Sequence, residues 1–271
     1  MRMLLGSVAL SVAACGTALA ADVPPRPATP ALKAQPSLYQ PYDIVLEIGG
    51  GGGIKPAYEG AKDFAFSPMV IVALHYLRVP GLGVVKDGVK KEGFSIGPSF
   101  RYVSERVSAD HVELRGLNNV DSSFELGGKF AYTFDMFRPF VAVRYGFGHE
   151  GIVGEAGLDL IMRPMEAVEV TFGPRASFAR GEYMRSYFGV TAAESIRSGM
   201  ATFKPGSGLK SAGAELGVRY EYTPEWAVVG TLAYDRLIGD AADSPIVKRG
   251  EANQITAKIG VSYKFGLKLF D

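Results

Sequence analysis

The chain has 271 residues, and its 29 basic and 28 acidic residues leave a formal net charge of +1. This near balance excludes the strongly basic field typical of nucleic-acid-binding proteins. A content of 34 glycines, 16 phenylalanines and 13 tyrosines disfavours long helices and favours strands joined by tight turns.

The first residues have the three-part layout of a secretory signal peptide. Arg2 precedes an uncharged apolar run, which ends in the small-residue cleavage pattern at residues 18–20. We therefore expect residues 1–21 to be a signal peptide that is removed on export. A lipoprotein signal, in which Cys15 carries the lipid, is the alternative. Residues 22–41 hold six prolines and few bulky apolar residues, which predicts an extended periplasmic lead-in.

Beyond residue 41, apolar and polar side chains alternate with a period of two, which is typical of strands and not of helices. About ten segments show this pattern, at residues 42–49, 66–77, 94–103, 122–134, 139–148, 152–162, 167–178, 211–222, 226–237 and 253–265. Most exceed the roughly five or six residues usual in soluble proteins and reach the roughly nine to eleven needed to cross a bilayer. The sequence thus predicts an all-β fold: a closed antiparallel transmembrane β-barrel over residues 42–271, with about ten strands and twelve possible.

Connection lengths point the same way, because outer-membrane barrels alternate short periplasmic turns with longer outer loops. We expect inner turns at 135–138, 163–166 and 223–225, and outer loops at 54–64, 105–120, 179–208 and 239–250. Two connections depart from the rule: the inner loop 78–92 is long, and the outer one near His149 is short.

The longest outer loop, 179–208, has a helix signal of its own. Thr191 and Glu194 form a capping box and Gly199 ends the turn, so we expect a short helix at residues 192–198. Residues 110–115 predict a second helical turn. Outer loops with structure of this kind either cap the barrel or bind partners, and Tyr183, Tyr187 and Phe188 fit an aromatic girdle at the rim.

Charged and apolar residues of the strands fall on opposite parities. A basic side chain facing lipid costs about 2–4 kcal/mol at the bilayer centre, so the charged parity is assigned to the lumen. Its seven basic and seven acidic members predict a mostly plugged interior with paired charges. The predicted lumen charge network includes Arg101, Glu125, Arg144, Arg175, Arg219 and Asp235.

Three stretches resemble catalytic or ligand-binding motifs, but each has a simpler structural interpretation. The acidic stretch at 239–245 lacks the spacing of a calcium loop, so turn residues at a wet rim are favoured, with Asp235 paired to a lumen arginine. His149 and Glu150 are adjacent, but no nucleophile motif accompanies them. The glycine run at 49–53 lacks the lysine of a phosphate-binding loop and predicts a kinked or closely approached strand. We expect no catalytic, metal or cofactor site.

Three blocks carry a family resemblance: YMRSYFGVTAAES (183–195), YEYTPEWAVVGTLAYDRLIGDAADSPIV (220–247) and IGVSYKF (259–265). With them, the chain from about residue 42 to 265 resembles the MipA/OmpV family of Gram-negative outer-membrane proteins. The resemblance implies a barrel, and for the family prototype it implies a scaffold that joins the lytic transglycosylase MltA to a penicillin-binding protein. Other members are described as adhesins or as porin-like.

These observations predict a non-enzymatic barrel of the Gram-negative outer membrane that binds no nucleic acid. With the family resemblance, they predict that it serves as a periplasm-facing scaffold for murein-remodelling enzymes. A narrow channel or uptake receptor, or a surface adhesin, is the alternative. The long inner loop supplies the expected periplasmic partner contacts, through Arg78, Lys86, Lys90 and Lys91.

Overall fold

Eleven β-strands form one antiparallel sheet in the computed structural model, which describes residues 39, 41–87, 92–148 and 151–270. The strands are β1 (Ile44–Pro56), β2 (Phe64–Val79), β3 (Gly83–Asp87), β4 (Gly93–Val103), β5 (Ser123–Thr133), β6 (Phe137–Phe147), β7 (Ile152–Met165), β8 (Val168–Ala179), β9 (Gly208–Glu221), β10 (Trp226–Leu237) and β11 (Asn253–Leu267). Their order is β3-β2-β1-β11-β10-β9-β8-β7-β6-β5-β4, so β1 pairs with β11.

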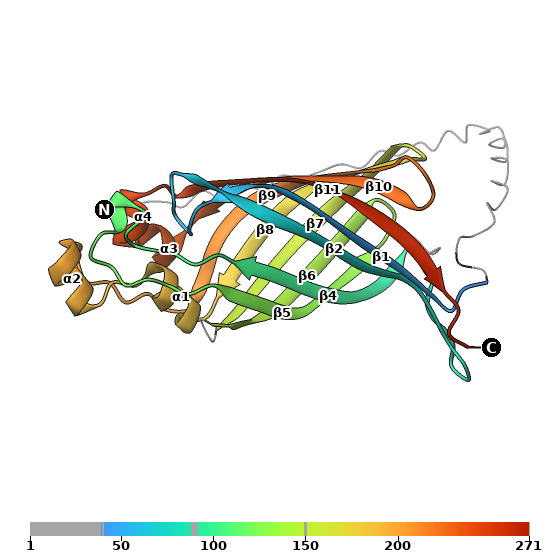
Figure 1. The fold of residues 1–271 in the computed structure, drawn as a ribbon, viewed down its shortest axis with the longest axis horizontal. Coiled ribbons are helices and arrows are strands. Elements are labelled where there is room, and N and C mark those ends of the chain that lie inside the picture. Colours follow the sequence, from blue (N-terminus) through green and yellow to red (C-terminus); the bar gives the residue numbers. More distant parts are fainter. Residues whose placement is uncertain (1–38, 40, 88–91, 149–150, 271) are drawn as a thin grey trace, which may run out of the picture. The chain divides into compact units, whose positions relative to one another are not determined.

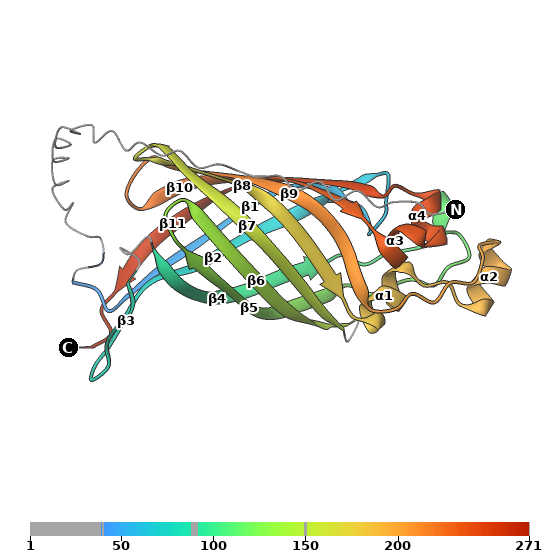
Figure 2. The ribbon, with the colours of Figure 1, turned by 180° about the vertical axis from the view of Figure 1, so that it is seen from behind.

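The sheet curls into a barrel wall of tilted strands (Figures 1 and 2). Cα atoms of β2 and β4, which lie at or next to the two edges of the sheet, come within 8 Å of each other. The predicted all-β antiparallel barrel is confirmed, and each of the ten predicted segments coincides with a strand. The additional strand, β3, is short and lies in the stretch predicted as the inner loop 78–92, so the described part of that loop up to residue 87 forms a β-hairpin with the end of β2.

In the part of the chain that the structure describes, no helix is long and apolar enough to span a membrane. The predicted signal peptide and nearly all of the Pro-rich lead-in lie outside the described residues.

The two faces of the sheet have the reverse of the polarity found in soluble proteins. Large apolar side chains face outward, with Val70 77% and Ile259 63% exposed. Carboxylates face inward, with Glu125 0% and Asp159 1% exposed. Soluble monomers rarely expose contiguous apolar patches beyond a few hundred Å², whereas a lipid-facing barrel presents an apolar band. The assignment of the charged parity to the lumen agrees with this burial.

The glycine run of β1 lies where two strands approach closely. A Cβ atom on Gly51 would lie 2.0 Å from the carbonyl oxygen of Ile259 and 2.4 Å from the Cα of Gly260, which stands opposite in the ladder. Gly49 and Gly53 show the same overlap with β11, whereas a Cβ on Gly50 would meet nothing nearer than 3.7 Å. Alternate glycines therefore let β1 approach β11 closely, as the sequence predicted.

The two ends of the barrel differ. Strands β5–β6, β7–β8 and β9–β10 are joined by tight turns at the end where β1 begins and β11 finishes. The opposite end carries the longer connections and the helices: η1 (Val112–Leu114), α1 (Gly181–Phe188), α2 (Ala192–Ser198), α3 (Gly239–Asp243) and α4 (Pro245–Arg249). Figure 1 shows these helices gathered at one end, away from the C-terminus.

The helices and loops form a cap with apolar cores of its own. Tyr183, Met184 and Phe188 of α1 pack with Leu237 and Val247 in one cluster. A second cluster joins residues of four loops, namely Tyr58, Ala61, Leu114, Leu117, Val190, Met200 and Ile246. The cap therefore has a water-excluding interior, in contrast to the charged lumen of the barrel.

The predicted helix in the longest loop is confirmed as α2. The Thr191 side chain accepts from the Glu194 amide, the Glu194 carboxylate accepts from the Thr191 amide, and Gly199 has φ 69°. The predicted aromatic girdle is wrong for Tyr183, Tyr187 and Phe188, which are buried in the cap because α1 turns its aromatic face inward. The helices α1, α3 and α4 are too short to show a helical period in the sequence.

Candidate functional site

Charged side chains of neighbouring strands pair across the lumen. Glu125 on β5 accepts two hydrogen bonds of 2.8 Å from Nε and Nη2 of Arg101, which lies directly opposite it on β4. Arg144 on β6 also contacts Glu125, at 3.3 Å, and reaches Glu155 on β7 at 3.2 Å. The buried Glu125 carboxylate thus meets two guanidinium groups, which offset its desolvation.

A second group surrounds Asp159 on β7. Nε of Arg138 donates to Asp159 Oδ2 at 2.9 Å, and Nη2 of Arg175 lies 2.6 Å from Asp159 Oδ1. Arg175 also reaches Glu215 on β9 at 3.2 Å. These pairs link four neighbouring strands, from β6 to β9.

A third group surrounds Glu47 on β1. Its carboxylate lies 2.5 Å from His75 Nε2 on β2 and 2.7 Å from Arg219 Nη1 on β9. Arg219 in turn contacts Glu221 at 3.1 Å, and Lys264 lies 3.4 Å from the same carboxylate. Glu47 and Arg219 are 172 residues apart in the sequence, so their contact exists only once the folded sheet has brought β1 and β9 together.

Five of the predicted network residues lie in these ion pairs: Arg101, Glu125, Arg144, Arg175 and Arg219. Asp235 does not, since among the described residues it has no ion pair and its Oδ1 lies 3.5 Å from Ser211 Oγ. In the ladder it faces Gly213 and Gln254, neither of which is a cation. The predicted pairing of Asp235 with an arginine is therefore wrong. Whether the network serves the function stays a prediction.

The acidic stretch 239–245 stabilises the cap. Asp240 Oδ2 accepts from the Gly206 amide at 2.7 Å, and Asp243 lies 3.4 Å from the Lys248 ammonium. Ser244 caps α4 and donates to the carbonyl of Phe188 at 2.7 Å. The stretch forms the short helix α3 and the start of α4, where the sequence predicted turn residues at a wet rim.

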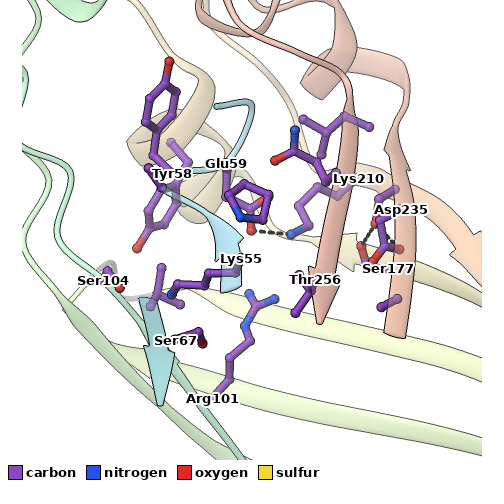
Figure 3. A pocket seen from close by; sticks show the side chains of 18 of the residues that line it. Lys55, Tyr58, Glu59, Ser67, Arg101, Ser104, Ser177, Lys210, Asp235 and Thr256 are labelled. Carbon is purple, nitrogen blue, oxygen red and sulfur yellow. Dashed lines mark hydrogen bonds and ion pairs between the residues drawn. The ribbon is translucent and has the colours of Figure 1, made fainter. Parts of the chain in front are cut away.

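Tyr183 of α1 is the point where the cap contacts the lumen. Its hydroxyl donates to Glu59 Oε1 at 2.7 Å, and it accepts from Arg101 Nη2 at 3.3 Å. Lys210 Nζ on β9 contacts the same Glu59 oxygen at 2.7 Å, as Figure 3 shows. Burial raises the pKa of Tyr183, which keeps its hydroxyl a donor. Burial alone would raise the pKa of Glu59, but the charges of Lys210 and Arg101 hold it below its usual value.

A cavity of about 270 Å³ lies beneath this contact, between the cap and the lumen (Figure 3). Its basic lining consists of Lys55, Arg101, Arg106, Arg175, Lys210 and Lys258. Its acidic lining consists of Glu59, Glu155, Glu215 and Asp235. The sequence did not predict the cavity, because its lining comes from eight separate strands, two loops and the helix α1.

The opposite end carries the β2–β3 hairpin, which holds two of the predicted partner contacts, Arg78 and Lys86. Arg78 donates to Asp43 Oδ1 through Nε at 2.9 Å and Nη2 at 2.5 Å, and Asp43 Oδ2 accepts from the amides of Leu269 and Phe270. Asp43, just before β1, therefore joins Arg78 at the end of β2 to the segment that follows β11. Lys86 is half-buried on β3.

Several predicted residues lie outside the described part of the chain, namely Lys90, Lys91, His149 and Glu150. Three other side chains could hold a metal ion: ligand atoms of Asp63, His111 and Glu113 all lie within 4.8 Å of one another on two outer loops. The Glu113 carboxylate also accepts from Tyr58 at 2.8 Å. The sequence did not predict this group, because Asp63 lies on a different loop from His111 and Glu113.

Residues 48–265 match the family model described as MltA-interacting protein MipA. The chain belongs to this family. The MltA-interacting protein of Escherichia coli strain K12 is 37% identical over 79 residues, which cover 29% of this chain and 31% of that protein. An uncharacterized protein of Treponema pallidum is 34% identical over 99 residues, or 36% and 42% of the two chains. The matched stretch thus spans less than half the length of these curated relatives.

Solved outer-membrane proteins are similar at low identity. Neisserial surface protein A is 8% identical with a TM-score of 0.27, covering 82% of this chain and 97% of that one. The porin NanC is 8% identical with a TM-score of 0.36, covering 81% and 98%.

Proposed function

We propose that this protein is a non-enzymatic barrel of the Gram-negative outer membrane that acts as a scaffold for murein-remodelling enzymes. A lytic transglycosylase and a penicillin-binding protein are its expected partners on the periplasmic side. Membership of a family described by its interaction with MltA supports a binding role over a catalytic one.

The β2–β3 hairpin is the observation that carries this proposal. It lies at the end with tight turns, which in outer-membrane barrels is the periplasmic end. Leu82, Val84 and Val85 are 77%, 51% and 58% exposed there. Burial of each such side chain against a partner contributes about 1.5–3 kcal/mol.

The backbone of the hairpin offers a second means of binding. β3 stands at the end of the strand order, so in the described residues one of its edges pairs with no other strand. A free strand edge can add an extended segment of a partner by main-chain hydrogen bonds. A lysine on this strand, Lys86, suits an acidic partner surface.

Recovery of purified MltA by the detergent-solubilised barrel tests the proposal. The double variant Val84→Lys/Val85→Lys should lower recovery at least about tenfold, because the partner would have to bury two charges. Ile196→Lys is the matched control, since Ile196 is 86% exposed on α2 at the other end. Equal recovery by both variants would remove the hairpin from the proposal, and no recovery by the unaltered barrel would refute the scaffold role.

Planar-bilayer recordings separate the scaffold from the channel alternative. The cap covers the outer mouth with apolar clusters, so the folded barrel should give no conductance steps. Reproducible steps from the unaltered protein would favour the channel.

A further inference from the structure

We propose that the cavity beneath the cap is a binding site for a small oxyanion, a carboxylate or a phosphate group, held between Lys55 of β1 and Lys258 of β11. This site is independent of the proposed scaffold role. It lies within the barrel, whereas the hairpin lies at the periplasmic end.

The two lysines differ from the other cations that line the cavity. Arg175 contacts Asp159 and Glu215, Lys210 contacts Glu59, and Arg101 contacts Glu125. Lys55 and Lys258 form no ion pair and no side-chain hydrogen bond within the described residues. Both are half-buried, so their ammonium groups have lost part of their water without gaining a protein partner.

The geometry brings these cations to one side of the cavity. The charges of Lys258 and Arg101 act on Lys55 more strongly than the opposite charge of Glu59 does. The charge of Arg101 likewise acts on Lys258 more strongly than that of Glu215. Figure 3 shows Lys55 and Arg101 on one side, away from Asp235 and Ser177. Mutual repulsion therefore raises the free energy of the empty site, and an anion between the lysines removes that repulsion.

Hydroxyl groups complete the site. Gly53 stands in the ladder between Lys258 of β11 and Ser67 of β2, so β1 places no side chain between these two residues. The Thr256 hydroxyl also lines the cavity, as Figure 3 shows. Two ammonium groups with hydroxyl donors bind the oxygens of a carboxylate or phosphate, and a cavity of about 270 Å³ holds a ligand of a few heavy atoms beyond that group.

Calorimetric titration of the full-length barrel refolded in detergent micelles tests the site. Inorganic phosphate and succinate serve as separate probes, with sodium chloride at matched ionic strength as the blank. Saturable binding of either probe is expected, and Lys55→Gln or Lys258→Gln should weaken it at least about tenfold, since each removes one charge-assisted hydrogen bond. Lys268→Gln, at an exposed lysine that follows β11 and does not line the cavity, is the matched control and should bind as the unaltered protein does.

The outcomes are decisive in either direction. Binding by phosphate alone or succinate alone identifies which group the site takes. If neither probe binds saturably, or if all three variants bind alike, the proposal is overturned. Should a cavity variant fail to refold, the Tm of the unaltered protein decides: a rise with the probe and not with chloride supports the site, and no rise refutes it.

Discussion

Replacement of Tyr183 by phenylalanine should loosen the cap without disturbing the barrel. The hydroxyl of Tyr183 joins α1 to the Glu59 carboxylate at 2.7 Å and to Arg101 at 3.3 Å. Phenylalanine keeps the ring, whose centroid lies 4.4 Å from that of Tyr187, so apolar packing is preserved. The substitution therefore isolates the two polar contacts.

The expected size follows from the shorter contact. A hydrogen bond to a charged group contributes about 1.5–3 kcal/mol, and the Arg101 contact is long enough to add little. A loss of about 2 kcal/mol raises the equilibrium for opening of the cap by a factor of about 30. Glu59 keeps its contact with Lys210, so it is not left without a partner.

Native-state hydrogen exchange of peptides that cover α1 measures this opening. Tyr220→Phe is the matched control, because Tyr220 is 48% exposed on the outer face of β9. Faster exchange confined to the cap is expected for Tyr183→Phe alone. The same exchange in both variants, or an increase spread evenly over the strands, would contradict a cap held by this hydroxyl.

Two further predictions concern barrel assembly and pH. Gly51→Ala should sharply reduce the folded, heat-shifted band on a detergent gel, because its Cβ overlaps the Ile259 carbonyl at 2.0 Å, whereas Gly50→Ala should fold normally. Burial alone would raise the pKa of Glu194, but hydrogen bonds from Thr191 and the Asn118 amide hold it below its usual value of about 4.5. Its stabilisation of α2 is thus present above about pH 4.5 and lost as the pH falls through the lower folded pKa, which exchange of α2 amides would detect; loss already at pH 6 would contradict this.

The strands were predictable because their signal is local. Each long strand repeats an apolar and a polar residue with a period of two, and a barrel wall preserves that alternation over its whole length. β3 was missed because residues 83–87 contain two adjacent valines and too few positions to show a period. The helix α2 was found and α1 was not, because α2 has the Thr191–Glu194 capping box and α1 has no side-chain cap.

The pairing of lumen charges was less accessible, because it depends on register. Arg101 and Glu125 stand opposite each other only after a loop of 19 residues has fixed how β4 and β5 align. Asp235 has the same parity and the same predicted role, yet the ladder places a glycine beside it on β9. Parity therefore predicts which residues enter the lumen, and register decides which of them meet.

The contrast between the two ends of the barrel bears most directly on function. At the outer end, Leu114, Ile246 and other large apolar side chains are buried under helices, although Ile196 of α2 is 86% exposed. At the periplasmic end, Leu82 and Val85 are exposed on a hairpin that extends past the tight turns. An exposed apolar hairpin of this kind is covered when a protein surface packs against it, which is consistent with the proposed partner on the periplasmic side.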